Sequence, residues 1–356
     1  MIGPGRGEGG SPTHPAAPGS HRAPGRDPAA VLEGLPAQVR KLHGEMHKVV
    51  VGQGAAIDAA LYALLSRGHC LLVGVPGLAK TLLVRSLARL LELDFARIQF
   101  TPDLMPSDIT GTIILQAEAG SEERRFVFQR GPLFTQVLLA DEINRTPPKT
   151  QAALLEAMQE KTVTVAGTTY PLNEPFIVLA TQNPIEQEGT YPLPEAQLDR
   201  FLFQVQVDYP SLEEERQIVA QHSFQPLEQL HPILSQQVLL SYRKAVALIP
   251  AAPNVMDYAV RLARSTRPTD PSAPDYITRW VRWGVSPRAS QNLILSARAA
   301  AACRGRFNVA CEDVVTVAPL VLRHRLIRSF QADAEGKSAD DIIARLLHDV
   351  SRDVPG

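Results

Sequence analysis

Hydrophobic residues along the chain form short continuous runs that alternate with segments of helical spacing. Between residues 31 and 66, apolar side chains recur every three or four positions, which predicts a pair of helices on either side of the run Val49 to Gln53. The apolar runs that follow are unbroken, as is typical of strands in a parallel sheet that helices cover on both faces. We expect strands at 70–73, 95–100, 137–140, 176–180 and 203–207. The predicted fold class is therefore α/β, a parallel five-stranded sheet flanked by helices.

Two pairs of short β-type segments interrupt this alternation. Residues 112–115 and 126–128 flank a charged turn at 118–125, and residues 162–165 and 168–172 flank Ala166-Gly167. Segments joined in this way are typical of β-hairpins. We expect two hairpins that project from the sheet.

The chain after Pro210 has a helical pattern. Ser211 and Glu214 have the spacing of a capping box, and further helices are expected at about 234–248, 254–265, 287–303 and 311–325. Residues 1–28 are rich in Gly, Pro, Ser and Arg and bury too little apolar surface to offset chain entropy. We predict a disordered tail at 1–28, an α/β core with two hairpin inserts at 29–225, and a smaller helical lid domain at 226–356.

Composition narrows the classes of partner. The net charge of −1 gives no overall electrostatic reason to bind nucleic acid or an anionic membrane. The apolar runs are far shorter than the ~20 residues that span a bilayer, and the first residues do not resemble a signal peptide, so we expect a cytoplasmic protein without membrane insertion. The three cysteines, Cys70, Cys303 and Cys311, lack the spacing of a disulfide framework or a zinc site and are expected to be buried.

The strongest chemical signal is the run GVPGLAKT, which follows an apolar strand and opens an amphipathic helix. That context is typical of a phosphate-binding P-loop, in which backbone N–H groups and the helix N-terminus hold the phosphates of ATP. Lys80 is expected between the β- and γ-phosphates, and the Thr81 hydroxyl on Mg²⁺. A glycine-rich turn into a structural helix is the alternative. The expected nucleotide contacts are Gly74, Pro76, Gly77, Leu78, Ala79, Lys80 and Thr81.

Ala79 occupies the position that is glycine in most P-loops. Alanine is the smallest replacement and permits close approach of a phosphate, provided that the position does not need a positive φ. An alanine at this position therefore departs from the general P-loop pattern and fits it only on that condition.

Two acidic residues, Asp141 and Glu142, end the apolar run at 137–140. Carboxylates at such a place are costly unless they meet a cation. Asp141 suits the shell of Mg²⁺, directly or through water, and Glu142 suits a general base that polarises the attacking water. The alternative is a solvated strand end.

Asn183 follows the predicted strand at 176–180, in the run ATQNP. Its amide emerges at the carboxyl edge of the sheet and could hydrogen-bond the attacking water and a γ-phosphate oxygen, whereas an ordinary Asn-Pro turn is the alternative. Arg200 ends a short helix before the last strand. It either complements that helix dipole or reaches a neighbouring subunit's γ-phosphate as an arginine finger.

Arg288 lies in the first turn of a helix that Ser286 and Pro287 begin. A cation is disfavoured there by the helix dipole, so an anionic partner is expected, either the nucleotide phosphate or a surface carboxylate.

Taken in order, these motifs resemble the AAA+ ATPases and, more narrowly, the MoxR family of the helix-2-insert group, which is related to magnesium-chelatase ATPase subunits. The resemblance covers residues 31 to 347 and rests on VVVGQ, GVPGLAKT, the run from Asp141 to Met158, ATQNP and SPRA; the alanine at Ala79 is itself similar to the MoxR form of the P-loop. It implies nucleotide contacts at Val51 and Gly52.

The roles that the resemblance implies are Walker A for Lys80 and Thr81, Walker B for Asp141 and Glu142, sensor 1 for Asn183, the arginine finger for Arg200 and sensor 2 for Arg288. The hairpin at 112–128 is similar to the helix-2 insert and that at 162–172 to the pre-sensor-1 insert. Arg145 lies close to the site and is a second finger candidate.

The resemblance also implies how the protein works. Family members are homo-oligomers, usually hexamers, with chaperone-like activity. They remodel or activate other proteins together with partners that carry a von Willebrand factor A (VWA) domain, in some cases to insert a metal cofactor. The VWA partner would be a separate protein here.

Three other functions are weighed against this one. A DNA-directed AAA+ motor is disfavoured by the near-zero net charge, and ATPase activity insensitive to DNA would remove it. A scaffold that holds ATP without hydrolysis lacks support, because Glu142, Asn183 and Arg200 are all present. A small-molecule kinase is least favoured, because no acceptor pocket is evident.

Overall fold

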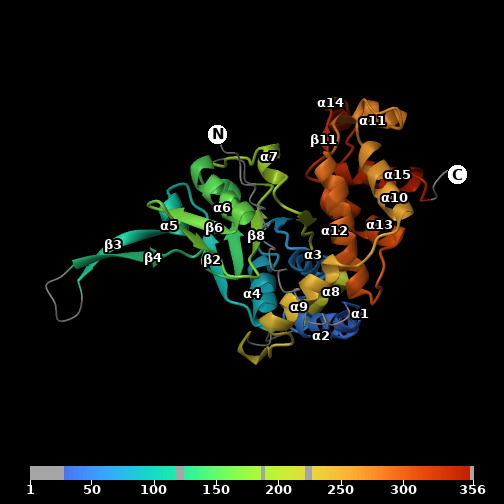
Figure 1. Cartoon of the computed structure of the whole chain (residues 1–356). Coiled ribbons are helices and arrows are strands. Elements are labelled where there is room, and N and C mark those ends of the chain that lie inside the picture. The colour runs from blue at the N-terminus through green and yellow to red at the C-terminus, as the bar shows by residue number, and fades with distance from the viewer. Residues whose placement is uncertain (1–27, 118–123, 186–188, 221–226, 353–356) are drawn as a thin grey trace, which may run out of the picture.

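The computed structural model describes residues 28–117, 124–185, 189–220 and 227–352. The predicted tail at 1–28, apart from its last residue, lies outside the described residues, as does most of the charged turn at 118–125. The predicted boundary between core and lid, after residue 225, falls outside them too. Figure 1 shows an α/β part, from which one long hairpin extends, beside a helical part that contains the C-terminal end of the chain.

A five-stranded parallel sheet lies at the centre of the α/β part, as the sequence predicts. Successive residues point to opposite sides: Leu72 and Leu139 pack in one hydrophobic cluster, whereas Leu71 and Leu138 pack in another. Both faces are therefore buried, which explains the unbroken apolar runs. The strands are β1 (Cys70–Val73), β2 (Phe95–Gln99), β5 (Val137–Asp141), β8 (Ile177–Gln182) and β9 (Phe203–Gln206), in the order β2-β5-β8-β1-β9.

Helices enclose the sheet. The single helix expected at the start of the described chain is two helices, because the chain turns at Glu33 and Gly34. The helical elements of this part are α1 (Pro28–Leu32), α2 (Leu35–His47), α3 (Gly54–Leu65), α4 (Lys80–Leu90), α5 (Pro106–Thr110), η1 (Ile143–Arg145), α6 (Pro148–Glu160), α7 (Glu195–Leu198), α8 (Leu212–Ala220) and η2 (Leu227–Gln229). The capping box predicted before α8 is present, with Ser211 N–H donating to Glu214 and Glu214 N–H donating to Ser211.

Both predicted hairpins are present as antiparallel pairs. The first joins β3 (Gly111–Ala117) to β4 (Arg124–Arg130), and the second joins β6 (Thr162–Val165) to β7 (Thr168–Pro171). The base of the first packs on the second, where Phe128 stacks on Tyr170 with ring centroids 4.4 Å apart. Further out, Leu115 and Phe126 are exposed on strands that extend away from the body (Figure 1).

The helical part packs against the first helices of the chain, since α12 contacts α2 and α3. Its elements are α9 (Gln236–Ala247), α10 (Pro253–Arg264), α11 (Asp275–Trp280), β10 (Val281–Trp283), α12 (Pro287–Cys303), α13 (Cys311–Leu322), β11 (Ile327–Arg328), α14 (Phe330–Ala334) and α15 (Ala339–Asp349). The four predicted helices are confirmed, although α13 ends three residues early. The short β10–β11 pair and α11, α14 and α15 were not predicted.

Two further expectations concern burial. Cys70 and Cys303 are buried, whereas Cys311 is half-buried at the first position of α13, so the expectation is wrong there. Among the described residues, no helix is long and apolar enough to cross a membrane.

Candidate nucleotide-binding site

The loop between β1 and α4 is shaped by close backbone contacts. A Cβ atom on Gly74 would lie 2.4 Å from the Val207 carbonyl oxygen, so only glycine fits under the end of β9. Gly77 adopts a φ of 85°, which also favours glycine. Lys80 is the first residue of α4, and its Nζ donates to the Gly74 carbonyl. The loop therefore surrounds a helix N-terminus whose free N–H groups suit an anion.

Ala79 does not meet the condition under which alanine would replace glycine in this loop without strain. It immediately precedes α4 and lies in the left-handed region, with φ 54° and ψ 20°. The condition that this position does not need a positive φ is therefore not met, because the turn into α4 uses the left-handed conformation. A Cβ atom in this conformation costs ~1–2 kcal/mol, which the surrounding structure must offset.

The predicted phosphate, metal and base residues share one cavity of about 380 Å³ beside this loop. Partial burial lowers the pKa of the Lys80 ammonium, while the nearby carboxylates of Asp141 and Glu142 oppose that shift. The cavity joins the end of β1 to the ends of β5 and β8. Its lining residues are Pro76, Gly77, Leu78, Ala79, Lys80, Thr81, Leu82, Asp141, Glu142, Thr181 and Asn183.

Thr181 fixes the two carboxylate residues relative to each other. Its hydroxyl donates to Asp141 Oδ1 at 2.5 Å and accepts from the Glu142 backbone N–H at 2.8 Å. Glu142 itself has a φ of 58°, an uncommon value for a residue with a side chain. The chain thus turns sharply after Asp141, so that both acidic side chains line the cavity.

Three polar side chains donate to one further oxygen of each carboxylate, Asp141 Oδ2 and Glu142 Oε2. Arg97 donates to Asp141 Oδ2 from Nε at 3.1 Å and from Nη2 at 2.7 Å. Glu142 Oε2 accepts from Gln99 at 2.8 Å and from Arg145 at 3.0 Å. Arg145, the second finger candidate, is therefore engaged with a carboxylate of its own chain.

Thr181, Arg97 and Gln99 belong to this site but were not predicted from the sequence. Thr181 stands within the quoted run ATQNP. Arg97 and Gln99 lie in β2, and the pairing of β2 with β5 brings Gln99 opposite Asp141. The available signal was the pair of polar side chains near the carboxyl end of a predicted strand, where ligands of parallel sheets bind.

Asn183 lies just beyond β8, with only 5% of the residue exposed. Its side-chain oxygen accepts from the Ile185 N–H at 3.2 Å, as an ordinary Asn turn would. The side chain also lines the cavity, so a turn and a cavity contact occur together.

A second, apolar recess of about 240 Å³ adjoins the first. The two share Gly77, Leu78, Ala79 and Leu82. Val51 lines this recess. Gly52 does not; it forms the turn before α3 with a φ of 79°, and a Cβ atom there would lie 3.0 Å from the Glu214 carboxyl carbon.

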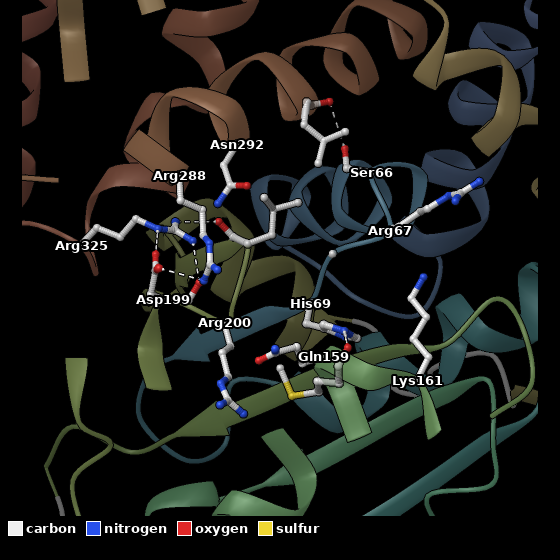
Figure 2. Close-up of a pocket in the computed structure, with 14 residues that line it drawn as sticks. Ser66, Arg67, His69, Gln159, Lys161, Asp199, Arg200, Arg288, Asn292 and Arg325 are labelled. Carbon is white, nitrogen blue, oxygen red and sulfur yellow. Dashed lines mark hydrogen bonds and ion pairs between the residues drawn. The ribbon is translucent and has the colours of Figure 1, made fainter. Parts of the chain in front are cut away.

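Arg200 and Arg288 do not reach the cavity of Lys80 in the same chain. They line a separate hollow between the sheet and α12 (Figure 2). Arg288 Nη1 lies 3.2 Å from Asp199 Oδ2, so its anionic partner within the chain is a carboxylate. Arg200 extends away from this pair and is exposed, and no described side chain forms an ion pair with it.

The donor set of the first cavity fits a magnesium ion that also binds phosphate. Thr81 supplies a hydroxyl and Asp141 a carboxylate, while no three His, Cys, Asp or Glu side chains among the described residues form a metal cage of their own. Mg²⁺ in phosphate-transfer sites is held by one or two protein ligands, substrate phosphates and water. The residues present therefore suit Mg·ATP rather than an independent metal site.

Comparison with known proteins agrees with this geometry. Residues 69–203 match the model of the ATPase family associated with various cellular activities (AAA), and residues 277–346 match the AAA lid domain. The chain is 46% identical over 344 residues to Chaperone MoxR1 of Mycobacterium tuberculosis, a match that covers 96% of this chain and 87% of that protein. The chain belongs to the MoxR family of AAA+ ATPases.

Other relatives support membership of the MoxR family. YeaC of Bacillus subtilis is 43% identical over 89% of this chain and 96% of its own length. Protein MoxR of Paracoccus denitrificans is 33% identical over 82% of this chain and 89% of its own length. A crystal structure from Cytophaga hutchinsonii has a TM-score of 0.82 and 42% identity, and the match covers 90% of this chain and 97% of that one.

Proposed function

We propose that this MoxR-family chain hydrolyses ATP with Mg²⁺ as a homo-oligomer, which we expect to be a hexamer. One observation carries the proposal. Lys80, Thr81, Asp141 and Glu142 share a cavity, whereas the exposed Arg200 lies in a different hollow of the same chain. An active site that needs all five residues therefore requires two subunits.

ATP would bind with its phosphates against the N-terminus of α4. Lys80 and the backbone N–H groups of the loop would contact the phosphate oxygens, and the apolar recess at Val51 suits the adenine ring because its lining is largely aliphatic. Gly52 would support that recess through its turn. Thr81 and Asp141 would hold Mg²⁺, which neutralises developing charge on the β- and γ-phosphates when it is bound.

Glu142 would act as the general base on the attacking water. Asn183 would orient this water, because its amide lines the same cavity and can both donate and accept hydrogen bonds. The oxygen of the attacking water would form a bond to the γ-phosphorus, and the water would lose a proton to the Glu142 carboxylate. The bond between the γ-phosphorus and the β–γ bridging oxygen would break, and ADP would leave with that oxygen.

Arg200 would reach the γ-phosphate bound to a neighbouring subunit, where it stabilises negative charge in the transition state. Arg288 would act beside it. Both come from the same hollow, and neither lines the P-loop cavity of its own chain. Arg145 is a weaker candidate for this role because it is bonded to Glu142 of its own chain.

We further propose that ATP hydrolysis drives chaperone-like remodelling or activation of another protein. A separate VWA-domain protein would act as the partner, and the remodelling could serve to insert a metal cofactor into the target protein. The relative from Mycobacterium tuberculosis is named a chaperone. The β3–β4 hairpin offers a contact surface, since Phe126 is 78% exposed and Leu115 is 51% exposed.

Changing Phe126 and Leu115 to Ser should leave basal phosphate release intact and abolish its stimulation by the VWA partner. Unchanged stimulation would exclude the hairpin as the contact surface for that partner.

The first experiment compares steady-state phosphate release by the wild type and Glu142→Gln, with size-exclusion light scattering of both under Mg·ATP. We expect the variant to bind ATP, to assemble like the wild type and to release phosphate at least ~100-fold more slowly, because it lacks only the base. Equal rates would refute Glu142 as the base. Nucleotide binding without phosphate release in the wild type would favour the non-hydrolysing scaffold, and stimulation by DNA would favour the DNA-directed motor.

A further inference from the structure

Three consecutive residues after α13 connect the lid to the strand that follows Arg200. Arg323 Nη1 donates to the Gln204 carbonyl at 2.6 Å, and His324 Nε2 lies 3.0 Å from the Phe201 carbonyl. Arg325 is the most deeply buried of the three arginines near Asp199, with 3% of its side chain exposed. The lid therefore contacts the chain on the C-terminal side of Arg200 through side chains that carry several donors.

The guanidinium of Arg325 bonds to residues on both sides of Arg200. Its Nε donates to Asp199 Oδ1 at 2.6 Å, and its Nη2 donates to the Asp199 and Phe201 carbonyls at 3.1 and 2.7 Å. Its Nη1 donates to the Leu202 carbonyl at 3.1 Å. These four bonds hold the turn between α7 and β9 in one conformation while Arg200 itself stays exposed.

Asp199 links this turn to the second arginine of the hollow. Its Oδ1 accepts from Arg325, and its Oδ2 pairs with Arg288 at the start of α12 (Figure 2). One carboxylate thus joins a residue beyond α13 to a residue at the start of α12. Asp199 and Arg325 therefore connect the backbone on both sides of Arg200 to Arg288.

Arg325 carries a charge that burial makes costly, because burial lowers its pKa, an effect that its bonds to Asp199 oppose. An aliphatic side chain would avoid this cost but would leave Asp199 and the carbonyls of the turn without these donors. What an aliphatic side chain cannot do is fix the peptide orientation on both sides of Arg200, because that needs donors in a rigid planar fork.

We propose that Arg325 is a positioning residue, which holds the Asp199–Leu202 turn on the lid so that Arg200 is presented to the ATP of the neighbouring subunit. The proposal rests on the proposed function, in which Arg200 acts across the subunit interface. Because Arg325 belongs to the lid, any change in lid orientation would move Arg200 and Arg288 together.

The test is phosphate release from mixed oligomers. Arg325→Met removes every donor and keeps a long side chain. Arg328→Met is the matched control, because Arg328 forms an ion pair with Asp333 that leaves both side chains partly exposed. Alone, Arg325→Met should bind ATP with an unchanged KM and lose at least ~10-fold in kcat, as expected when an interaction made only in the transition state is misplaced. Arg328→Met should match the wild type.

Mixing then shows on which subunit Arg325 acts. An equal mixture of Arg325→Met and Glu142→Gln should be several-fold more active than either variant alone. The Arg325→Met subunit has an intact nucleotide cavity, and a Glu142→Gln neighbour can supply it with a correctly placed Arg200. A mixture of Arg325→Met and Arg200→Ala should not, since neither subunit then presents a correctly placed finger. The opposite pattern, recovery only with Arg200→Ala, would mean that Arg325 serves its own cavity and would overturn the proposal.

A reference mixture separates this proposal from the one on which it rests. Glu142→Gln mixed with Arg200→Ala must regain activity if Arg200 acts between subunits; without that recovery the proposed intersubunit site fails, whatever Arg325 does. If Arg325→Met does not assemble, the same mixtures are made with Asp199→Asn, which keeps the backbone acceptors of the turn. That variant should be complemented by Glu142→Gln and not by Arg200→Ala, and any other pattern overturns the role of Arg325.

Discussion

The side-chain amide of Gln99, at the end of β2, donates a 2.8 Å hydrogen bond to Glu142, just beyond the end of β5. Glu142 must be free to approach the attacking water if it is the base, so this bond should restrain turnover. We expect Gln99→Ala to raise basal phosphate release by up to about fivefold, the equivalent of a hydrogen bond of ~1 kcal/mol. Steady-state phosphate release measures the change.

The control is the same substitution in a Glu142→Gln background, where no rise is expected because the effect acts through the Glu142 carboxylate. A fall in rate in Gln99→Ala would show instead that Gln99 orients the base for reaction.

If Asp141 holds Mg²⁺ as proposed, Arg97 must compete with the metal ion for this carboxylate. Both of its bonds to this carboxylate go to Oδ2, and the Arg97 side chain is 46% exposed. An exposed ion pair contributes up to ~1 kcal/mol, so Arg97→Ala should lower the Mg²⁺ concentration for half-maximal phosphate release by up to about fivefold. Magnesium titration at fixed ATP tests this, with Arg124→Ala on the exposed hairpin as a control for net charge. If the Mg²⁺ concentration for half-maximal phosphate release does not change, the pairing of Arg97 with Asp141 does not compete with metal binding.

The sequence predicts those parts of the site that a single strand and its next turn determine. The P-loop follows from a glycine pattern between an apolar strand and a helix, and Asp141 and Glu142 follow from acids at the end of an apolar run. These signals are local, so neither the strand order nor the position of any other element is needed to recognise them.

The parts that were missed depend on long-range pairing. Gln99 contacts Glu142 because β2 lies beside β5, a neighbour relation that the order β2-β5-β8-β1-β9 creates and no short segment encodes. Arg325 was assigned to the end of a helix at 311–325, yet α13 ends at Leu322. The chain leaves the helix there, and Arg325 binds Asp199, a residue far away in sequence.

Ala79 provides a test of backbone strain at the phosphate loop. Ala79 has a φ of 54°, so Ala79→Gly relieves backbone strain in the folded state. Glycine also increases the conformational entropy of the unfolded chain, which offsets part of this gain. We therefore expect the free energy of unfolding to rise by ~0.5–1 kcal/mol. Chemical denaturation without nucleotide measures this. Ala166→Gly, at a φ of 48° in the β6–β7 turn, should give a similar gain.

The matched control is Ala152→Gly on the exposed side of α6, which should lose ~1 kcal/mol because glycine is unfavourable inside a helix. A loss at Ala79 equal to that at Ala152 would contradict the strain argument.

Acid sensitivity should come in part from His69, which lies between the sheet and α6. The Val178 N–H donates to its Nδ1 at 2.9 Å, and its Nε2 donates to the Met158 carbonyl at 3.2 Å. Burial lowers the pKa of this imidazole to about 4. In the unfolded chain the pKa returns to about 6.5, so between these values the unfolded state binds a proton that the folded state does not.

Above pH 7, His69 is neutral in both states, so its titration should not change the free energy of unfolding. As the pH drops from about 6.5 to about 4, protonation of His69 in the unfolded chain should lower the free energy of unfolding by up to ~3 kcal/mol. His69→Gln retains one donor and one acceptor but does not titrate in this range. The free energy of unfolding of the variant should therefore fall less steeply between about pH 6.5 and about pH 4 than that of the wild type, whatever its value at pH 7.

Burial also lowers the pKa of His324, so part of the acid dependence should remain in His69→Gln. Denaturation midpoints from pH 4 to 7.5 give the slope, with His348→Gln, whose side chain is 88% exposed, as the control. Equal slopes for His69→Gln and the wild type would mean that His69 is protonated in the folded protein.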